Sequence, residues 1–210
     1  MNFTPAQQTH VRMMREVLRS VQETPLVLKG GTALLLCYGL DRFSEDLDFD
    51  APKKLNLESR IENALRPITQ QLRITRTKDT DTVQRYRIEY ASASVQGRLK
   101  VEVSCRDAVD ESDVQELQGV RTYRAARLIA QKINALENRT TARDLYDVHF
   151  LATHFRSEFQ PVLVGRLLTL TADVNQLEGR FMPAFEEDDL FRDKAEMLPS
   201  LILELHEAMK

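Results

Sequence analysis

The sequence has few of the features that mark secreted or membrane proteins. Only two of its 210 residues are cysteines, Cys37 and Cys105, and both stand in apolar surroundings. This pattern favours buried thiols in a reducing cytoplasm over a disulfide framework. No apolar run approaches the ~20 residues of a membrane-spanning helix, and the first residues lack the apolar segment of a signal peptide. We therefore expect a cytoplasmic protein with no membrane partner.

The sequence also lacks an excess of positive charge. It has 29 Lys and Arg against 32 Asp and Glu, a net charge of −3. Proteins with a general affinity for nucleic acid are usually basic, so any RNA contact must come from a local patch. Two clusters of basic residues are candidates, although solvated charges on an exposed surface explain them at least as well. They are Arg73, Arg76, Lys78, Arg85 and Arg87, and Arg121, Arg124 and Arg127.

The two halves of the chain differ in predicted secondary structure. Hydrophobic periodicity predicts helices over 5–22 and 57–72 in the first half and strands over 26–28, 46–50, 73–78, 82–90 and 98–105. The second half has no strong strand signal and predicts helices over 123–136, 141–155, 161–170 and 199–209. An acidic stretch that ends in glycine, 107–119, is the best boundary. We expect a mixed α/β domain over 1–118 and a helical domain over 119–210.

Alternating acids form the most informative strand. Asp46, Asp48 and Asp50 are two residues apart, so they share one face of a strand. Neighbouring carboxylates repel and need a cation, a basic neighbour or open solvent. Mg²⁺ commonly takes one or two carboxylates together with water and substrate phosphates. Acids alternate on many exposed strands, so this pattern alone is weak evidence for a metal site. If the later strand that carries Glu102 lies alongside, three carboxylates converge, as in two-metal sites.

A double glycine precedes this strand. Gly30, Gly31 and Thr32 follow a short strand and open a helix, so main-chain N–H groups there can face a phosphate. The simpler interpretation is a tight turn with Thr32 as the helix cap. Ser44 either bonds a phosphate or caps its own turn. The spacing matches neither a P-loop nor a dinucleotide-binding fingerprint.

Two charged residues lie within apolar helix faces in the second half. Lys132 falls between Leu128 and Leu136 at helical spacing, and Asp144 falls within the next helix's apolar arc. A charge that faces a core is costly unless it is paired or bound to a ligand. A structural ion pair between the two helices is one interpretation. The other is a cleft in which Lys132 neutralises triphosphate charge and Asp144 positions it.

Four motifs in this order resemble the AbiEii/AbiGii family of nucleotidyltransferase-like toxins, within the polymerase-β-type nucleotidyltransferase superfamily. They are the glycine pair and the D-x-D of LVLKGGTALLLCYGLDRFSEDLDFD, and the later KINAL and RDLYD. The family more often has serine in the glycine motif, and threonine keeps the hydroxyl. The resemblance places Gly30, Gly31 and Thr32 in the glycine motif, Asp46 and Asp48 in the metal-binding pair, Lys132 and Asp144 in the later motifs, and Glu102 at a third acidic position.

The resemblance implies an α+β nucleotidyltransferase fold, with a small mixed sheet flanked by helices and a C-terminal helical bundle. It implies Mg²⁺-dependent transfer of a nucleoside monophosphate from an NTP, with the 3′ end of tRNA as acceptor in related toxins and a cognate antitoxin as partner. Glu102 or Asp144 would serve as general base. Two alternatives stay open: nucleotidylation of a small molecule or protein hydroxyl, and a non-catalytic binding module on the same fold.

Overall fold

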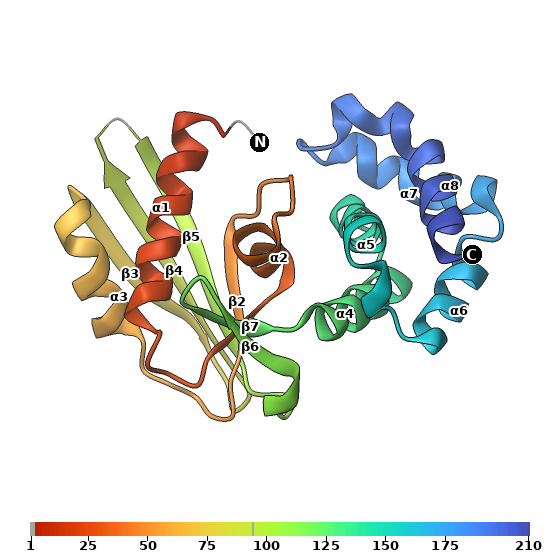
Figure 1. Cartoon of the computed structure of the whole chain (residues 1–210). Helices are drawn as coiled ribbons and strands as arrows, with labels where there is room; N and C mark the ends of the chain where they lie inside the picture. Colours follow the sequence, from red (N-terminus) through yellow and green to blue (C-terminus); the bar gives the residue numbers. More distant parts are fainter. Residues whose placement is uncertain (1–2, 94) are drawn as a thin grey trace. The chain divides into compact units, whose positions relative to one another are not determined.

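The computed structural model describes residues 3–93 and 95–210, and the chain divides into two compact units between Tyr123 and Arg124 (Figure 1). The expected boundary after residue 118 falls too early. A hairpin of two short strands, β6 (Val114–Leu117) and β7 (Val120–Tyr123), still belongs to the first unit. Each of these strands is only four residues long, so alternation does not stand out and no strand was predicted there.

The first unit contains a mixed seven-stranded sheet among its described residues, in the order β3-β4-β5-β2-β1-β7-β6. Strand β2 (Asp46–Asp50) runs parallel to β5 and antiparallel to β1, and β1 runs parallel to β7. The carboxylate strand therefore lies inside the sheet, with neighbours on both sides. The remaining strands are β1 (Val27–Lys29), β3 (Gln71–Asp79), β4 (Val83–Ser92) and β5 (Val95–Ser104). The turn expected between β4 and β5 includes residue 94, which lies outside the described residues.

Three helices pack on this sheet. Helix α1 (Pro5–Ser20) begins with the expected Thr4 cap, which forms a capping box with Gln7. Helix α2 (Gly30–Tyr38) contacts β1, β2 and β7, and α1 contacts α3 and β5. Helix α3 (Glu58–Leu65) is shorter than expected because Pro67 ends it in the 3-10 turn Arg66–Ile68. Leu72, which we expected in that helix, belongs to β3.

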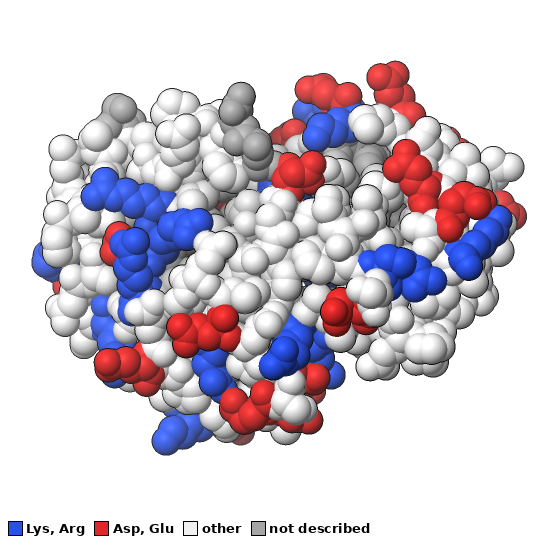
Figure 2. All heavy atoms as spheres, in the orientation of Figure 1, with Lys and Arg blue, Asp and Glu red and all other residues white. Residues whose placement is uncertain are grey.

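The two faces of the sheet differ in character. Leu47, Phe49, Val101 and Val103 are buried on the face that the helices cover. The alternate residues Asp46, Asp48, Lys100 and Glu102 are partly exposed on the other face. Because side chains alternate along a strand, the hydrophobic residues face the helices and the polar residues face the other side. On the side that Figure 2 shows, Lys and Arg are interspersed with Asp and Glu.

The second unit is helical, as expected. Its helices are α4 (Ala125–Asn138), α5 (Ala142–His154), α6 (Pro161–Leu170), α7 (Val174–Glu187) and α8 (Leu198–Met209). Helix α7 was not predicted because it contains Gly179 and Pro183, which usually interrupt helices. Short 3-10 segments lie at Glu111–Asp113 in the first unit and at Arg156–Glu158 and Arg192–Met197 in the second. Throughout 3–93 and 95–210, no helix has the length and apolar character needed to cross a membrane.

Both cysteines are free thiols, but they are partly exposed rather than buried as expected. Cys37 lies on α2 and Cys105 directly follows β5. Partial burial outweighs the opposing charge of Arg15 and raises the pKa of Cys37 to about 11. This thiol is therefore almost fully protonated at neutral pH and a poor nucleophile.

Candidate active site

The polar face of β2 carries the candidate metal-binding carboxylates. The side chains of Asp46 and Asp48 are 35% and 37% exposed. In the parallel register with β5, Lys100 lies opposite Asp46 and Glu102 lies opposite Asp48. Glu102 is thus on the strand next to β2, as the predicted three-carboxylate site required.

The side chains nevertheless do not form a three-carboxylate cluster. Glu102 accepts a hydrogen bond of 2.7 Å from Arg85 Nε, which lies opposite it on β4. Lys100 Nζ lies 2.7 Å from Asp46 Oδ2 and 3.7 Å from Asp48 Oδ1. Nowhere among the described residues are three His, Cys, Asp or Glu side chains grouped as a metal site. The expectation that Glu102 converges with the other two is therefore not met, because Arg85 binds Glu102 and Lys100 lies against Asp46.

Asp50 has a different environment from the other two acids. Its carboxylate is 2% exposed and lies 2.5 Å from Lys29 Nζ. The Tyr123 hydroxyl donates a hydrogen bond of 3.0 Å to its other oxygen. Asp50 is thus a buried, fully paired residue that ties β1, β2 and β7 together, and only Asp46 and Asp48 are open to a ligand.

Burial raises the pKa of Asp48 above its ordinary value. Repulsion from Asp46 and Glu102 adds to this effect, whereas Lys100 and Lys29 oppose it. The ionised pair is therefore incompletely neutralised by the protein. A hard divalent cation with water and phosphate oxygens completing its shell fits two adjacent carboxylates of this kind, so Asp46 and Asp48 are the residues that would hold Mg²⁺.

The glycine motif lies next to this pair. Lys29 is opposite Asp48 in the antiparallel register of β1 and β2, and Gly30 follows at the start of α2 with φ of 73°. A Cβ atom on Gly30 would lie 3.8 Å from Asp48 Oδ2. No side chain caps the N-terminus of α2. Its first N–H groups lack intrahelical partners, which makes them donors for an anion such as a phosphate.

Thr32 and Ser44 shape the motif from inside. Thr32 is 2% exposed, and its hydroxyl donates to the main-chain oxygen of Asp46 rather than capping α2. Its Oγ1 lies 2.8 Å from Ser44 Oγ. The two hydroxyls therefore join the glycine turn to the strand that carries the carboxylates. We assign Thr32 this positioning role, and Ser44, which is partly exposed, keeps its expected role toward a phosphate as a prediction.

Gly31→Ala is expected to destabilise the protein by about 1–3 kcal/mol, as overpacked sites do. The added Cβ would lie 2.7 Å from Arg42 Nη2 and 3.0 Å from Ser44 Oγ, and Arg42 is only 5% exposed. Urea unfolding measures the effect. Gly165→Ala is the control, because a Cβ there meets nothing within 4 Å. Equal stability of the two variants would show that the turn tolerates a side chain.

One positioning residue was missed by sequence reasoning. His10 on α1 is buried, with Nε2 2.8 Å from the carbonyl oxygen of Glu45 and Nδ1 2.8 Å from the Tyr90 hydroxyl. A carbonyl only accepts, so Nε2 carries the proton. His10 thereby fixes the residue that directly precedes Asp46. A single histidine on a helix carries no sequence signal of such a contact.

In the second unit, Lys132 and Asp144 form the buried pair that the sequence offered as the structural interpretation. Lys132 Nζ lies 3.1 Å from Asp144 Oδ1 and 2.6 Å from Asp147 Oδ2. The two carboxylates are 1% and 0% exposed. Arg139 and Thr141 donate further hydrogen bonds of 2.6 Å each to Asp144. Asp147 was not predicted, although it lies three residues after Asp144 and four before Leu151, within the same apolar arc.

The pairing of Asp144 predicts a loss of stability in acid. Burial alone would raise its pKa, but Lys132, Arg139 and Thr141 outweigh burial and lower it to about 2. A carboxylate with a depressed pKa stabilises the fold above its ordinary pKa, and this contribution is lost as the pH falls toward the folded-state value. The loss amounts to about 2 kcal/mol. In urea unfolding, the difference in stability between the wild type and Asp144→Asn should shrink as the pH falls from about 5 to about 2. An unchanged difference would contradict this assignment.

Comparison with known proteins decides the family. A family model described as "Nucleotidyl transferase AbiEii toxin, Type IV TA system" matches residues 12–208. The chain belongs to the AbiEii nucleotidyltransferase toxin family. It is therefore a nucleotidyltransferase, and membership of a type IV toxin–antitoxin family implies a nucleotide substrate and an antitoxin partner. No curated protein sequence matches the chain.

Solved structures support the nucleotidyltransferase fold. JHP933 from Helicobacter pylori is 39% identical and matches with a TM-score of 0.92, over 99% of this chain and 92% of that one. A putative nucleotidyltransferase from H. pylori is 38% identical, with a TM-score of 0.90, over 99% and 94% of the two chains. The Megavirus polyadenylate synthase is 11% identical and shares the fold alone, with a TM-score of 0.51 over 88% of this chain and 40% of that one. The α+β nucleotidyltransferase fold is thus confirmed.

Proposed function

We propose that the protein transfers a nucleoside monophosphate from an NTP to the 3′ end of a tRNA, with Mg²⁺ held by Asp46 and Asp48. The observation that carries the proposal is the contact between the two motifs. The uncapped start of α2 lies next to the partly exposed carboxylate pair, since a Cβ atom added to Gly30 would lie 3.8 Å from Asp48 Oδ2. An anion site and a cation site side by side suit a metal-bound triphosphate.

Each group in the first unit has a distinct task in this reaction. The N–H groups at Gly30 and Gly31 bind phosphate oxygens, and Thr32 holds that turn against β2. Bound Mg²⁺ would neutralise phosphate charge and lower the barrier to attack on the α-phosphorus. The acceptor hydroxyl forms the new P–O bond, pyrophosphate leaves, and the hydroxyl proton passes to a base. Glu102, which lies opposite Asp48 in the β2–β5 register and is bound by Arg85, is the carboxylate proposed for that proton.

The buried pairing of Lys132 and Asp144 supports a structural role for both residues. Their expected action on the triphosphate stays a prediction, and so does Asp144 as general base. The family membership argues against the non-catalytic alternative.

Lys100→Met is expected to lower the dissociation constant for Mg²⁺ several-fold. In the metal-free protein the Lys100 ammonium offsets part of the charge of Asp46 and Asp48, so a bound cation must compete with it. The melting temperature in EDTA should fall, because the two carboxylates lose their counter-charge. Calorimetric titration with Mg²⁺ and thermal melting measure the two effects independently of activity.

Lys54→Met is the matched control for Lys100→Met. Lys54 is 39% exposed against 36% for Lys100, and it pairs with Asp79 at 2.9 Å, away from the carboxylate pair. This variant should leave Mg²⁺ binding unchanged. Equal Mg²⁺ affinity in wild type, Lys100→Met and Lys54→Met would contradict the role given to Lys100.

A labelling screen tests the proposed acceptor. The purified protein is incubated with Mg²⁺ and each α-labelled NTP in turn, together with total RNA, a protein extract or a small-molecule fraction. We expect label in the tRNA fraction. The net charge of −3 mildly favours the small-molecule or protein alternative, and label confined to those fractions would replace tRNA as acceptor.

A further inference from the structure

Basic side chains gather on the polar face of β3, β4 and β5. In the antiparallel registers, Arg73 of β3 lies opposite Glu89 of β4, and Glu89 lies opposite Arg98 of β5. Arg87, two residues before Glu89, lies opposite Lys100. Because residues two apart share a face, these side chains lie on the same side of the sheet as Asp46. We refer to Arg73, Arg87 and Arg98 as the basic face.

The basic face has more cation than its carboxylate can neutralise. Glu89 lies 3.6 Å from Arg98 Nη2 and 3.7 Å from Arg87 Nε, both beyond hydrogen-bond distance. Among the described residues Arg73 makes no ion pair, and Arg87 Nε has no hydrogen-bond acceptor although solvent does not reach it. Arg98 is 68% exposed and Arg87 is 42% exposed. The basic face thus has three guanidinium groups and one carboxylate, in a chain whose net charge is −3.

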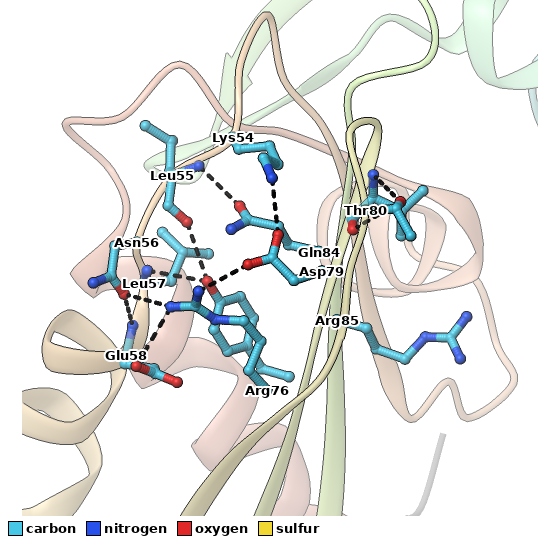
Figure 3. A network of polar contacts seen from close by, with 12 residues as sticks. Lys54, Leu55, Asn56, Leu57, Glu58, Arg76, Asp79, Thr80, Gln84 and Arg85 are labelled. Atoms are coloured by element: carbon cyan, nitrogen blue, oxygen red, sulfur yellow. Dashed lines mark hydrogen bonds and ion pairs between the residues drawn. The ribbon is translucent and has the colours of Figure 1, made fainter.

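The structure divides the basic cluster seen in the sequence. Figure 3 shows Arg76 and Arg85 pointing to opposite sides of the strands. Arg76 binds Asp79 and Glu58 on the helix-covered side. Arg85 is on the polar side, but it is already paired with Glu102. The arginines of that cluster left for a ligand are therefore Arg73 and Arg87, and Arg98 of β5 joins them on the same side of the sheet.

A hollow of about 590 Å³ lies beside these residues. Arg73, Glu89 and Arg98 line it together with Gly97, whose lack of a side chain leaves room for the Tyr90 ring. The hollow lies across β3, β4 and β5, and β5 is the direct neighbour of the carboxylate strand. A ligand that fills it can therefore continue along the sheet toward Asp46.

We propose that the basic face binds the phosphate backbone of the RNA acceptor while the end of that RNA reaches Asp46 and Asp48. This inference rests on the proposed function, because the acceptor must extend from the carboxylate pair. β3 is three strands away from β2, about 14 Å at the usual strand spacing. One RNA strand can touch both places at once.

Charge and geometry favour RNA over an acidic protein as the occupant. A planar guanidinium binds two phosphate oxygens at once, and repeated phosphates match arginines spread over neighbouring strands. The basic face also continues directly to the reaction site, which an acceptor requires and an inhibitory protein partner does not.

The test compares equilibrium RNA binding of three forms of the full chain by fluorescence anisotropy, with an in vitro transcribed tRNA and no NTP. The variant Arg73→Ala/Arg87→Ala/Arg98→Ala should bind at least tenfold more weakly than wild type at about 0.1 M salt. The slope of the logarithm of its binding constant against the logarithm of the salt concentration should be shallower by about two. Arg66→Ala is the matched control, since Arg66 is also 68% exposed but lies on the segment after α3 and pairs with Glu62. It should bind like wild type. The Mg²⁺- and NTP-induced rise in melting temperature should be the same in all three forms, which shows that the triple variant is folded.

Equal RNA affinity of the triple variant and wild type, or no RNA binding by wild type, would overturn the inference. Loss of poly-glutamate binding with RNA binding intact would also overturn it, because the face would then serve an acidic protein. The binding assay needs no nucleotide transfer. If the protein binds tRNA through these arginines but does not label RNA, the proposed function is refuted, and the assignment of the basic face to RNA binding stands.

Discussion

Asp48→Asn is expected to abolish nucleotidyl transfer and to raise the melting temperature of the metal-free protein. Removing one of two carboxylates that would hold Mg²⁺ removes several kcal/mol of charge stabilisation, so the rate should fall about a thousandfold or more. Stability should change in the opposite direction. The pKa of Asp48 is raised by burial and then by Asp46 and Glu102, so its ionised form opposes folding at neutral pH. Asparagine keeps the shape and removes that charge. Label transfer and melting in EDTA measure the two effects.

Asp79→Asn is the matched control for this variant. The Asp79 side chain is 36% exposed against 37% for Asp48, but Lys54 and Arg76 bind it and lower its pKa. Its ionised form therefore favours folding, and the variant should melt slightly lower than wild type while transfer is unchanged. Normal transfer by Asp48→Asn would show that the carboxylate pair is not the metal site. An unchanged or lower melting temperature in EDTA would contradict the electrostatic account of Asp48.

Lys132→Met is expected to destabilise the helical unit by about 3–5 kcal/mol, the usual effect of removing one partner of a buried ion pair. Methionine fills the space of the stem but leaves the carboxylates of Asp144 and Asp147 without their shared ammonium. The side chains of Asp144 and Asp147 are 1% and 0% exposed, so water cannot replace the lost ammonium. Urea unfolding followed by circular dichroism measures the loss.

Two further variants test whether the effect of Lys132→Met comes from buried charge. In Lys132→Met/Asp147→Asn one of the two buried carboxylates becomes neutral, so part of the lost stability should return. Lys194→Met, at an exposed position of the same unit, should change stability by less than about 0.5 kcal/mol. If Lys132→Met keeps full stability but loses nucleotidyl transfer, Lys132 instead serves to neutralise the triphosphate charge.

The sequence was sufficient for the features that repeat locally. Helical spacing predicted α4, α5, α6 and α8 to within a few residues, and the apolar arc of α4 is buried as expected. Alternation predicted the two faces of β5, because one face of a sheet must be hydrophobic to pack on helices. The motifs of the family identified the glycine turn and the carboxylate pair, which lie next to each other in the structure.

The features that the sequence did not reveal depend on contacts between distant segments. Arg85 lies opposite Glu102 through the β4–β5 register, and this pairing explains why the third carboxylate does not converge with the others. His10 reaches Glu45 from a separate helix. The strand β7 is four residues long and is defined by its place beside β1, where the Thr122 hydroxyl donates to the carbonyl of Leu28. None of these contacts leaves a periodic pattern in the residues themselves.

The most direct test of the central claim is transfer to a tRNA whose terminal ribose has been oxidised with periodate, compared with the untreated tRNA. The carboxylate pair and the glycine turn are proposed to join a nucleotide to the 3′-hydroxyl, so the untreated tRNA should become labelled in the presence of Mg²⁺ and the oxidised tRNA should not. Equal labelling of both RNAs, or labelling of neither while another substrate accepts the nucleotide, would contradict transfer to the 3′ end.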